Sequence, residues 1–203
     1  MALLTVSVLG PLLVTRDTAP VDDFGYNKVR ALLVYLAVEA GPPHQSAYLC
    51  SLLWPDQPDR ASRRNLSQAL TQLRRLFGGL GALEVSAPLL NSSLETVQLN
   101  PAAAVEVDAA QFIGLLAASE RHAHRSWHTC AACAERLQTA LKLYRGDFLA
   151  GFSLPDSAPF EEWAIIWRER MRQRALSTLE RLAWWAAGRA LTPEEALALA
   201  LDH

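Results

Sequence analysis

The chain has 203 residues, of which 51% are hydrophobic and 20% charged, and its formal net charge is −2. This composition is typical of a folded globular protein and excludes a largely disordered chain. The sequence holds no run of about 18 apolar residues that could cross a bilayer, and Met1–Gly10 lacks the basic start of a signal peptide. Its three cysteines do not make a disulfide framework. We therefore expect a cytoplasmic protein of one large domain or two small ones.

The first hundred residues predict a pair of strands and then three helices. Short apolar runs at Leu3–Leu9 and Leu12–Thr15 flank a Gly-Pro turn and predict the two strands. Apolar residues at helical spacing predict the helices, which Asn27, Ser46 and Asp59 can cap. The three helices are expected over residues 27–40, 46–53 and 60–77.

A β-hairpin is predicted next, from Ala82–Ser86 and Thr96–Leu99, with a polar tip at Asn91–Ser93. Strands, three closely connected helices and a hairpin are the parts of a winged helix-turn-helix. The N-terminal half is therefore predicted to be a winged-helix domain.

The chain is predicted to become all-helical after Pro101, which marks the expected domain boundary. Helices are expected over residues 108–120, 129–144 and 159–187, with a further helix start at Thr192. The expected fold class is thus an α+β winged helix-turn-helix over residues 1–102, followed by an all-α helical-repeat domain over residues 103–203.

The third predicted helix has an apolar stripe and a cationic face. Leu66, Leu70 and Leu73 fall on one side, and the stretch from Arg60 to Leu83 contains five arginines and no acid. The residues on the far side or at its border are Arg60, Arg63, Arg64, Ser67, Gln68, Thr71, Arg74 and Arg75. Arginine can bind guanine through two hydrogen bonds and glutamine can do the same for adenine, while further arginines neutralise phosphates.

The N-terminal half of a recognition helix meets the base edges, so each residue can be given a role. We assign Arg60, Arg63, Arg64, Ser67 and Gln68 to the DNA groove, Asn65 and Thr71 to its flanks, and Arg74 and Arg75 to the DNA backbone. Lys28 and Arg30, at the start of the first helix, are further candidates for phosphate contacts. The alternative is an ordinary solvated face, but such a face normally mixes charges of both signs.

Several motifs resemble those of a known family. Leu53–Asp56, Arg63–Leu70 and Leu73–Leu76, followed by Leu143–Leu149 and Phe160–Trp163, are similar to the antibiotic-regulatory-protein type of bacterial transcriptional activators. The resemblance implies an OmpR-like winged helix followed by a bacterial transcriptional activator domain built of tetratricopeptide-like helices.

The resemblance also implies partners. Double-stranded DNA is the expected ligand, possible homodimers would bind repeated half-sites, and the loop with Trp54, Asp56 and Gln57 is expected to lie near RNA polymerase. The tip residues Asn91, Ser92 and Ser93 would approach the minor groove or the backbone. Because the family's helical module usually exceeds the roughly 100 residues after Pro101, the chain looks shortened, either as a fragment or as a naturally reduced form.

A cluster of histidines and cysteines follows the first helix of the C-terminal half. It comprises His122, His124, His128, Cys130 and Cys133. The Cys-x2-Cys spacing suits zinc, but a structural site usually draws its ligand pairs from two segments, and the sequence offers one. We therefore expect no cofactor and no metal, with zinc at these five residues as the alternative.

The sequence favours a binding protein over an enzyme. It contains no Gly-x-Ser-x-Gly, His-Glu-x-x-His or phosphate-binding loop. Four of its tryptophans, Trp163, Trp167, Trp184 and Trp185, are expected to pack in a helical core. The predicted function is a DNA-binding transcriptional regulator. The alternative is a protein-interaction module whose winged helix binds protein, and a salt-dependent DNA affinity would distinguish the two.

Overall fold

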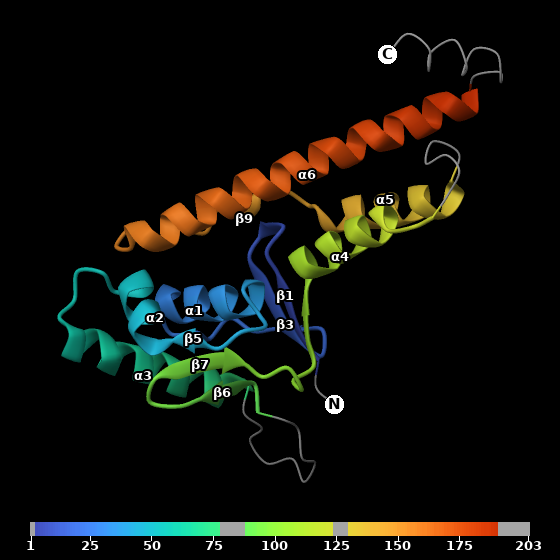
Figure 1. Cartoon of the computed structure of the whole chain (residues 1–203). Helices are drawn as coiled ribbons and strands as arrows, with labels where there is room; N and C mark the ends of the chain where they lie inside the picture. The colour runs from blue at the N-terminus through green and yellow to red at the C-terminus, as the bar shows by residue number, and fades with distance from the viewer. Residues whose placement is uncertain (1–2, 78–87, 124–129, 191–203) are drawn as a thin grey trace.

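The computed structural model describes residues 3–77, 88–123 and 130–190. It has a mixed-sheet N-terminal part with three helices and a C-terminal part dominated by three further helices, of which α6 is the longest (Figure 1). No helix among the described residues is long and apolar enough to cross a membrane. The expected fold class is confirmed.

The N-terminal sheet has four strands in the order β4-β3-β1-β8. β1 (Leu4–Ser7) pairs antiparallel with β3 (Leu13–Arg16), which pairs in turn with β4 (Ala19–Pro20). On its other side β1 pairs in parallel with β8 (Val105–Val107). β8 follows the predicted boundary at Pro101, so the chain returns to the N-terminal sheet before the long helices begin.

Three helices pack beside this sheet. α1 covers Asn27–Val38, α2 covers Ser46–Leu53 and α3 covers Asp59–Phe77. The predicted side-chain caps of the first two helices are wrong, because the cap positions are Tyr26 and Gln45 and neither side chain makes a capping hydrogen bond. Gln45 belongs to the short strand β5 (His44–Gln45) and has an extended backbone, so Ser46 is the first helical residue and not the cap.

A three-stranded sheet, in the order β5-β7-β6, contains the predicted hairpin. β7 covers Thr96–Leu99 as predicted, and it pairs with β6 (Leu90–Ser92). The other predicted strand, Ala82–Ser86, lies outside the described residues. The predicted tip is displaced, since Asn91 and Ser92 pair within β6. The turn instead follows Ser93, whose Oγ accepts the backbone N–H groups of Glu95 and Thr96 at 3.2 and 3.0 Å.

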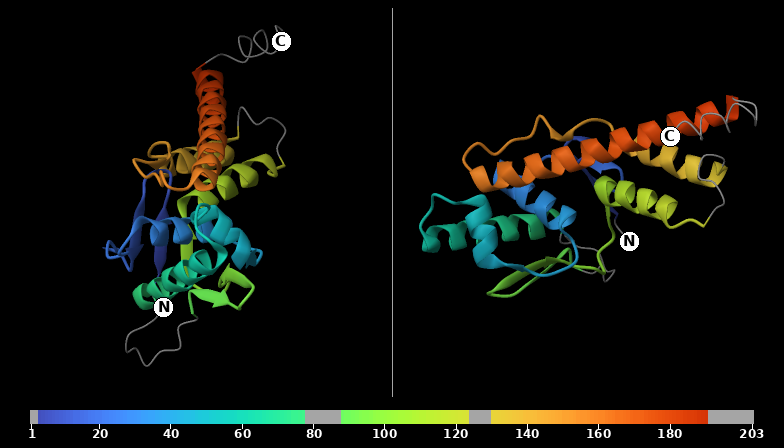
Figure 2. Two further views of the ribbon diagram at one scale, coloured as in Figure 1. Left: turned by 90° about the vertical axis from the view of Figure 1, so that its left-hand side faces the viewer. Right: turned by 45° about the horizontal axis from the view of Figure 1, so that its top comes forward.

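The C-terminal part contains α4 (Asp108–Glu120), α5 (Ala131–Leu143) and α6 (Ala158–Ala190). It is not purely helical, because β9 (Phe148–Ala150) pairs in parallel with β2 (Gly10–Pro11). Strands of two or three residues have too little periodicity to be recognised in a sequence. α6 runs along one side of the molecule, whereas α3 and the β6–β7 hairpin lie on the other (Figures 1 and 2).

Buried polar contacts join the two parts. Glu39, at the end of α1, accepts the indole N–H groups of Trp163 and Trp167, each at 2.8 Å. Trp163 also packs against Tyr35, with ring centroids 5.1 Å apart. Core packing of these two tryptophans is confirmed, while Trp184, further along α6, is 43% exposed.

A second group of contacts surrounds Asp108, the first residue of α4. Its carboxylate accepts the backbone N–H groups of Val8 and Leu9 at 2.8 and 3.0 Å, and it pairs with Arg145 at 3.1 Å. Gly10 follows directly, and a Cβ atom there would lie 3.3 Å from the Cβ atom of Arg145. We call the contacts of Glu39 with the two tryptophans, and those of Asp108, the domain seam.

Candidate nucleic-acid interface

α3 begins after Pro58, whose carbonyl accepts the backbone N–H groups of Ala61 and Ser62. The Ser62 hydroxyl donates to the Asp59 carbonyl at 3.0 Å and so closes the first turn. The predicted apolar stripe of the helix is buried and consists of Leu66, Ala69, Leu70 and Leu73. Phe77, at the end of the stripe, is half-buried and packs on Phe24 with ring centroids 6.2 Å apart.

The opposite side of α3 is exposed throughout. We call it the arginine face, and it consists of Arg60, Arg63, Arg64, Ser67, Gln68, Thr71, Arg74 and Arg75. Asn65 is half-buried at its edge. One helix therefore presents the residues that the sequence assigned to the DNA groove and to the DNA backbone.

The arginines of this face differ in their internal partners. Within the described part of the chain, Arg60, Arg63 and Arg64 form no ion pair. Arg75 lies 3.9 Å from Asp23, with both side chains well exposed, and Arg74 donates to the Ser92 hydroxyl of β6. The guanidinium groups in the N-terminal half of the face are thus exposed without an acidic partner among the described residues, and Arg74 connects the helix to the hairpin.

A groove borders the arginine face on the side of α1. Its volume is about 430 Å³, and Asn65 and Gln68 contribute to its wall together with Tyr26 and Gln57. The wall is completed by the loop Leu154–Asp156 of the C-terminal part. Asn65 and Gln68 therefore stand where α3 meets both parts of the molecule.

The two basic residues of α1 have intramolecular roles. The Lys28 ammonium pairs with Asp156 at 2.8 Å, donates to the Leu53 carbonyl at 2.5 Å and lies over the Trp54 ring. Arg30 donates to the Asp22 carbonyl at 3.2 Å and stacks over Phe24. Lys28 is only 12% exposed, and its ammonium group is already paired within the fold.

The loop between α2 and α3 separates into a buried and an exposed part. Trp54 is 5% exposed and belongs to the core, which removes its side chain from any contact with polymerase. Asp56 and Gln57 are exposed and stay candidates for such a contact.

Cys50, on α2, lies close to Arg63 of the arginine face. Burial raises the pKa of the Cys50 thiol, which favours its neutral form.

The hairpin carries two features that the sequence analysis missed. Leu94, in the turn, is 94% exposed, although Asn91, Ser92 and Ser93 beside it were recognised as an exposed polar group. Gln98, on β7, donates to the Gly41 carbonyl at 2.6 Å and fixes the hairpin to the loop after α1. Leu94 could have been recognised in the sequence as a single apolar residue within a polar turn. Nothing in the sequence indicates the hydrogen bond of Gln98.

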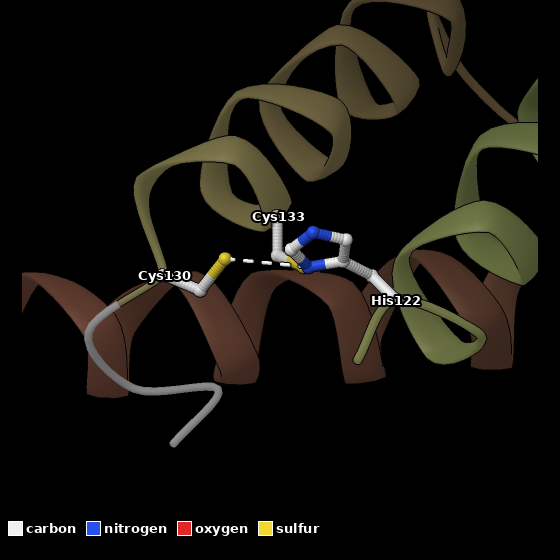
Figure 3. A group of neighbouring side chains, drawn as sticks. All are labelled: His122, Cys130 and Cys133. Carbon is white, nitrogen blue, oxygen red and sulfur yellow. Dashed lines mark hydrogen bonds between the residues drawn. The ribbon is translucent and has the colours of Figure 1, made fainter. Parts of the chain in front are cut away.

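The residues of the alternative zinc site lie between the end of α4 and the first turn of α5. His122, Cys130 and Cys133 converge there (Figure 3). His124 and His128 lie outside the described residues.

Comparisons with known proteins show what the chain is similar to in sequence and in fold. The sequence model of the family "Bacterial transcriptional activator domain" matches residues 107–200. The transcriptional regulatory protein EmbR of Mycobacterium tuberculosis, and that of Mycobacterium bovis, are 35% identical to this chain over 78 residues. That alignment covers 38% of this chain and 20% of each EmbR. These matches support the resemblance of the chain to the antibiotic-regulatory-protein type of bacterial transcriptional activators.

A solved structure agrees in fold with the whole chain. It is Mycobacterium tuberculosis EmbR in complex with a low-affinity phosphopeptide, with a TM-score of 0.70 and 24% sequence identity. The match covers 100% of this chain and 51% of that one, so the chain spans about half the length of EmbR. At this identity the likeness shows a common fold, with a winged helix before the helical domain.

Proposed function

We propose that this chain is a sequence-specific DNA-binding activator of transcription that reads the major groove with α3. The observation that carries the proposal is the arginine face. It is exposed, it contains no acid, and its first three arginines form no ion pair among the described residues. Such a face on the third helix of a winged helix matches the charge and the hydrogen-bonding pattern of duplex DNA.

Individual roles follow from position along the helix. Arg60, Arg63, Arg64, Ser67 and Gln68 occupy the N-terminal half and would reach base edges, with Asn65 and Thr71 at the flanks. Arg74 and Arg75 would contact phosphates, and Asn91–Ser93 would approach the adjacent DNA backbone. The hydrogen bond from Arg74 to Ser92 supports one continuous surface of helix and hairpin.

The partners of the remaining surfaces belong to the same proposal. Asp56 and Gln57 project from the loop before α3 and would contact RNA polymerase. The helical domain, proposed from residue 103 onward, would oligomerise or bind a regulatory partner, and a homodimer would occupy repeated half-sites. The proposal includes no catalytic activity.

The test is selection of bound sequences from a random duplex pool, followed by fluorescence anisotropy at several salt concentrations. Arg63→Ala/Arg64→Ala should weaken binding of the selected sequence. The slope of its salt dependence should become shallower by about 0.9 for each phosphate that the variant no longer neutralises. The matched control is Arg172→Ala/Arg174→Ala, which removes the same charge from exposed positions on α6.

A selected motif, a steep salt dependence and a loss confined to the α3 variant would establish the proposal. Equal losses in both double variants would show that affinity follows net charge and not the arginine face. If no sequence is selected and binding is weak in all three proteins, the DNA-binding role is wrong. The helical domain as a protein-interaction module would then be the better account.

A further inference from the structure

Three side chains that are typical metal ligands converge where the chain passes from α4 to α5 (Figure 3). His122 follows the end of α4, Cys130 occupies the N-cap position of α5, and Cys133 lies in the first turn of α5. The Nδ1 atom of His122 is 3.5 Å from the Cys130 sulfur and 3.3 Å from the Cys133 sulfur. The three potential ligand atoms all lie within 4.8 Å of one another. We call these residues the Cys–His cluster.

These separations match those between ligands of one tetrahedral zinc ion. With Zn–S bonds of about 2.3 Å and Zn–N bonds of about 2.0 Å, tetrahedral angles place sulfur and nitrogen about 3.5 Å apart. The two observed distances between nitrogen and sulfur are 3.5 and 3.3 Å. We propose that His122, Cys130 and Cys133 bind one zinc ion and leave the fourth coordination position to a further donor.

The donor set selects the class of metal. Thiolate and imidazole ligands suit zinc, whereas calcium and magnesium require oxygen ligands. The sequence alone argued against a site because its histidines and cysteines form a single run. In the fold this run connects two helices, and it supplies one ligand from the end of α4 and two from the start of α5.

The position of the cluster suggests what the metal would do. α4 and α5 pack along each other and form a helical hairpin (Figure 1). At one end of this hairpin, Asp108 anchors α4 to the N-terminal sheet. The Cys–His cluster lies at the other end. A zinc ion there would fix the end of the hairpin opposite Asp108 and would stabilise the surface that α5 presents to α6.

The competing explanation is a neutral cluster held by hydrogen bonds. Cys133 is 2% exposed and its sulfur lies 3.7 Å from the Ser119 carbonyl, so its thiol has an acceptor without a metal. In that case the three side chains would pack together and would bind zinc no better than an isolated cysteine. Metal binding by the intact chain separates the two explanations.

The experiment measures zinc binding to the 203-residue chain, kept reduced, by competition with a chromophoric chelator. Co²⁺ then replaces zinc as a spectroscopic probe of thiolate ligation. The informative variant is Cys130→Ser, because serine is a favoured N-cap residue and should leave α5 folded while removing one sulfur ligand. His122→Gln tests the imidazole ligand, and Cys50→Ser is the matched control, since Cys50 is a buried cysteine on α2 outside the cluster.

We expect one equivalent of zinc per wild-type chain, and a Co²⁺ complex with thiolate charge-transfer bands and tetrahedral d–d bands. Replacing a residue that only supports a metal ligand weakens binding about 10–100-fold, so removal of a direct ligand in Cys130→Ser or His122→Gln should weaken it by at least that factor. Cys50→Ser should bind as the wild type does, and a chelator should lower the Tm of the wild type but not that of Cys130→Ser.

Two results would overturn the proposal. One is a wild-type affinity that Cys130→Ser leaves unchanged, with circular dichroism showing that both proteins are folded. The other is an equal loss of affinity in Cys50→Ser, which would mean that the loss does not depend on a thiol of the Cys–His cluster.

Discussion

The domain seam and the N-terminal half of the arginine face both hold charged side chains, but they differ in the internal partners that those side chains have. Asp108 accepts three backbone N–H groups and pairs with Arg145, and Glu39 accepts two indole N–H groups. On α3, by contrast, Arg60, Arg63 and Arg64 are exposed and form no ion pair within the described chain.

This difference separates charges that hold the molecule together from charges that are available for binding. A buried carboxylate is tolerated only when hydrogen bonds replace its water. An exposed guanidinium needs no such compensation and offers five N–H donors to a ligand. Changes at the seam should therefore alter stability and leave DNA affinity nearly unchanged, whereas changes near α3 should do the reverse.

The largest expected effect on stability is at Asp108. Asp108→Ala leaves the N–H groups of Val8 and Leu9 without their acceptor and Arg145 without its ion pair. We expect a decrease of about 3–5 kcal/mol in the free energy of unfolding, measured by urea denaturation, because the two buried N–H groups left without an acceptor cost about 1–3 kcal/mol each.

Asp156→Ala is the matched control for that change. Asp156 also pairs with a basic residue, Lys28, but is itself 65% exposed, so its removal should cost less than about 1 kcal/mol. Similar decreases in the two variants would contradict the assignment of Asp108 as the main anchor of α4.

A smaller effect is expected at Glu39. Glu39→Ala removes the acceptor of both Trp163 and Trp167, and a hydrogen bond to a charged group contributes about 1.5–3 kcal/mol. The free energy of unfolding should fall by about 2–4 kcal/mol in total, since part of the effect is relieved by relaxation. Glu39→Gln keeps one acceptor oxygen and should be less destabilised.

The same variant tests whether the seam and the arginine face are separable. α6 and α3 lie on different sides of the molecule (Figure 1), so the DNA affinity of folded Glu39→Ala should stay within about twofold of the wild type. A large drop in affinity, measured below the unfolding transition, would show that the seam also positions α3.

Strong local patterns in the sequence predicted most of the fold. Helix α4 begins at the expected residue and α1 one residue before the start that an Asn27 cap implies, and the buried stripe of α3 follows directly from apolar spacing. Strands β8 and β9 were missed, because each is three residues long and is stabilised by pairing with a segment about a hundred residues or more away in the chain. Such short strands form because they pair with distant segments, and the periodicity of the sequence does not indicate that pairing.

The candidate interface was predictable only where it depends on local helical periodicity. Helical periodicity placed the arginines of α3 on one exposed face. Periodicity could not show that Lys28 forms an ion pair with Asp156, because the two residues are far apart in the sequence and meet only in the tertiary fold. Nor could it show that Trp54 is buried, or that His122, just after the end of α4, approaches Cys130 and Cys133.

The smallest expected effect concerns Asp23, whose carboxylate pairs with Arg75 of the arginine face. It lies 3.9 Å from Arg75 with 86% of its side chain exposed, so Asp23→Asn should change the free energy of unfolding by less than about 0.5 kcal/mol. Its carboxylate nevertheless stands where a phosphate would approach Arg75. Removing the charge should therefore raise DNA affinity by about two- to fivefold at low salt, and the gain should fade as salt screens it.

Glu162→Gln makes the same charge change on α6, away from α3, and should alter affinity less than Asp23→Asn does. Anisotropy titrations of both variants at two salt concentrations would measure this. Equal gains would mean that DNA senses the net charge of the chain. A gain specific to Asp23→Asn would instead place Arg75 at the DNA backbone and extend the contact surface to the C-terminal end of α3.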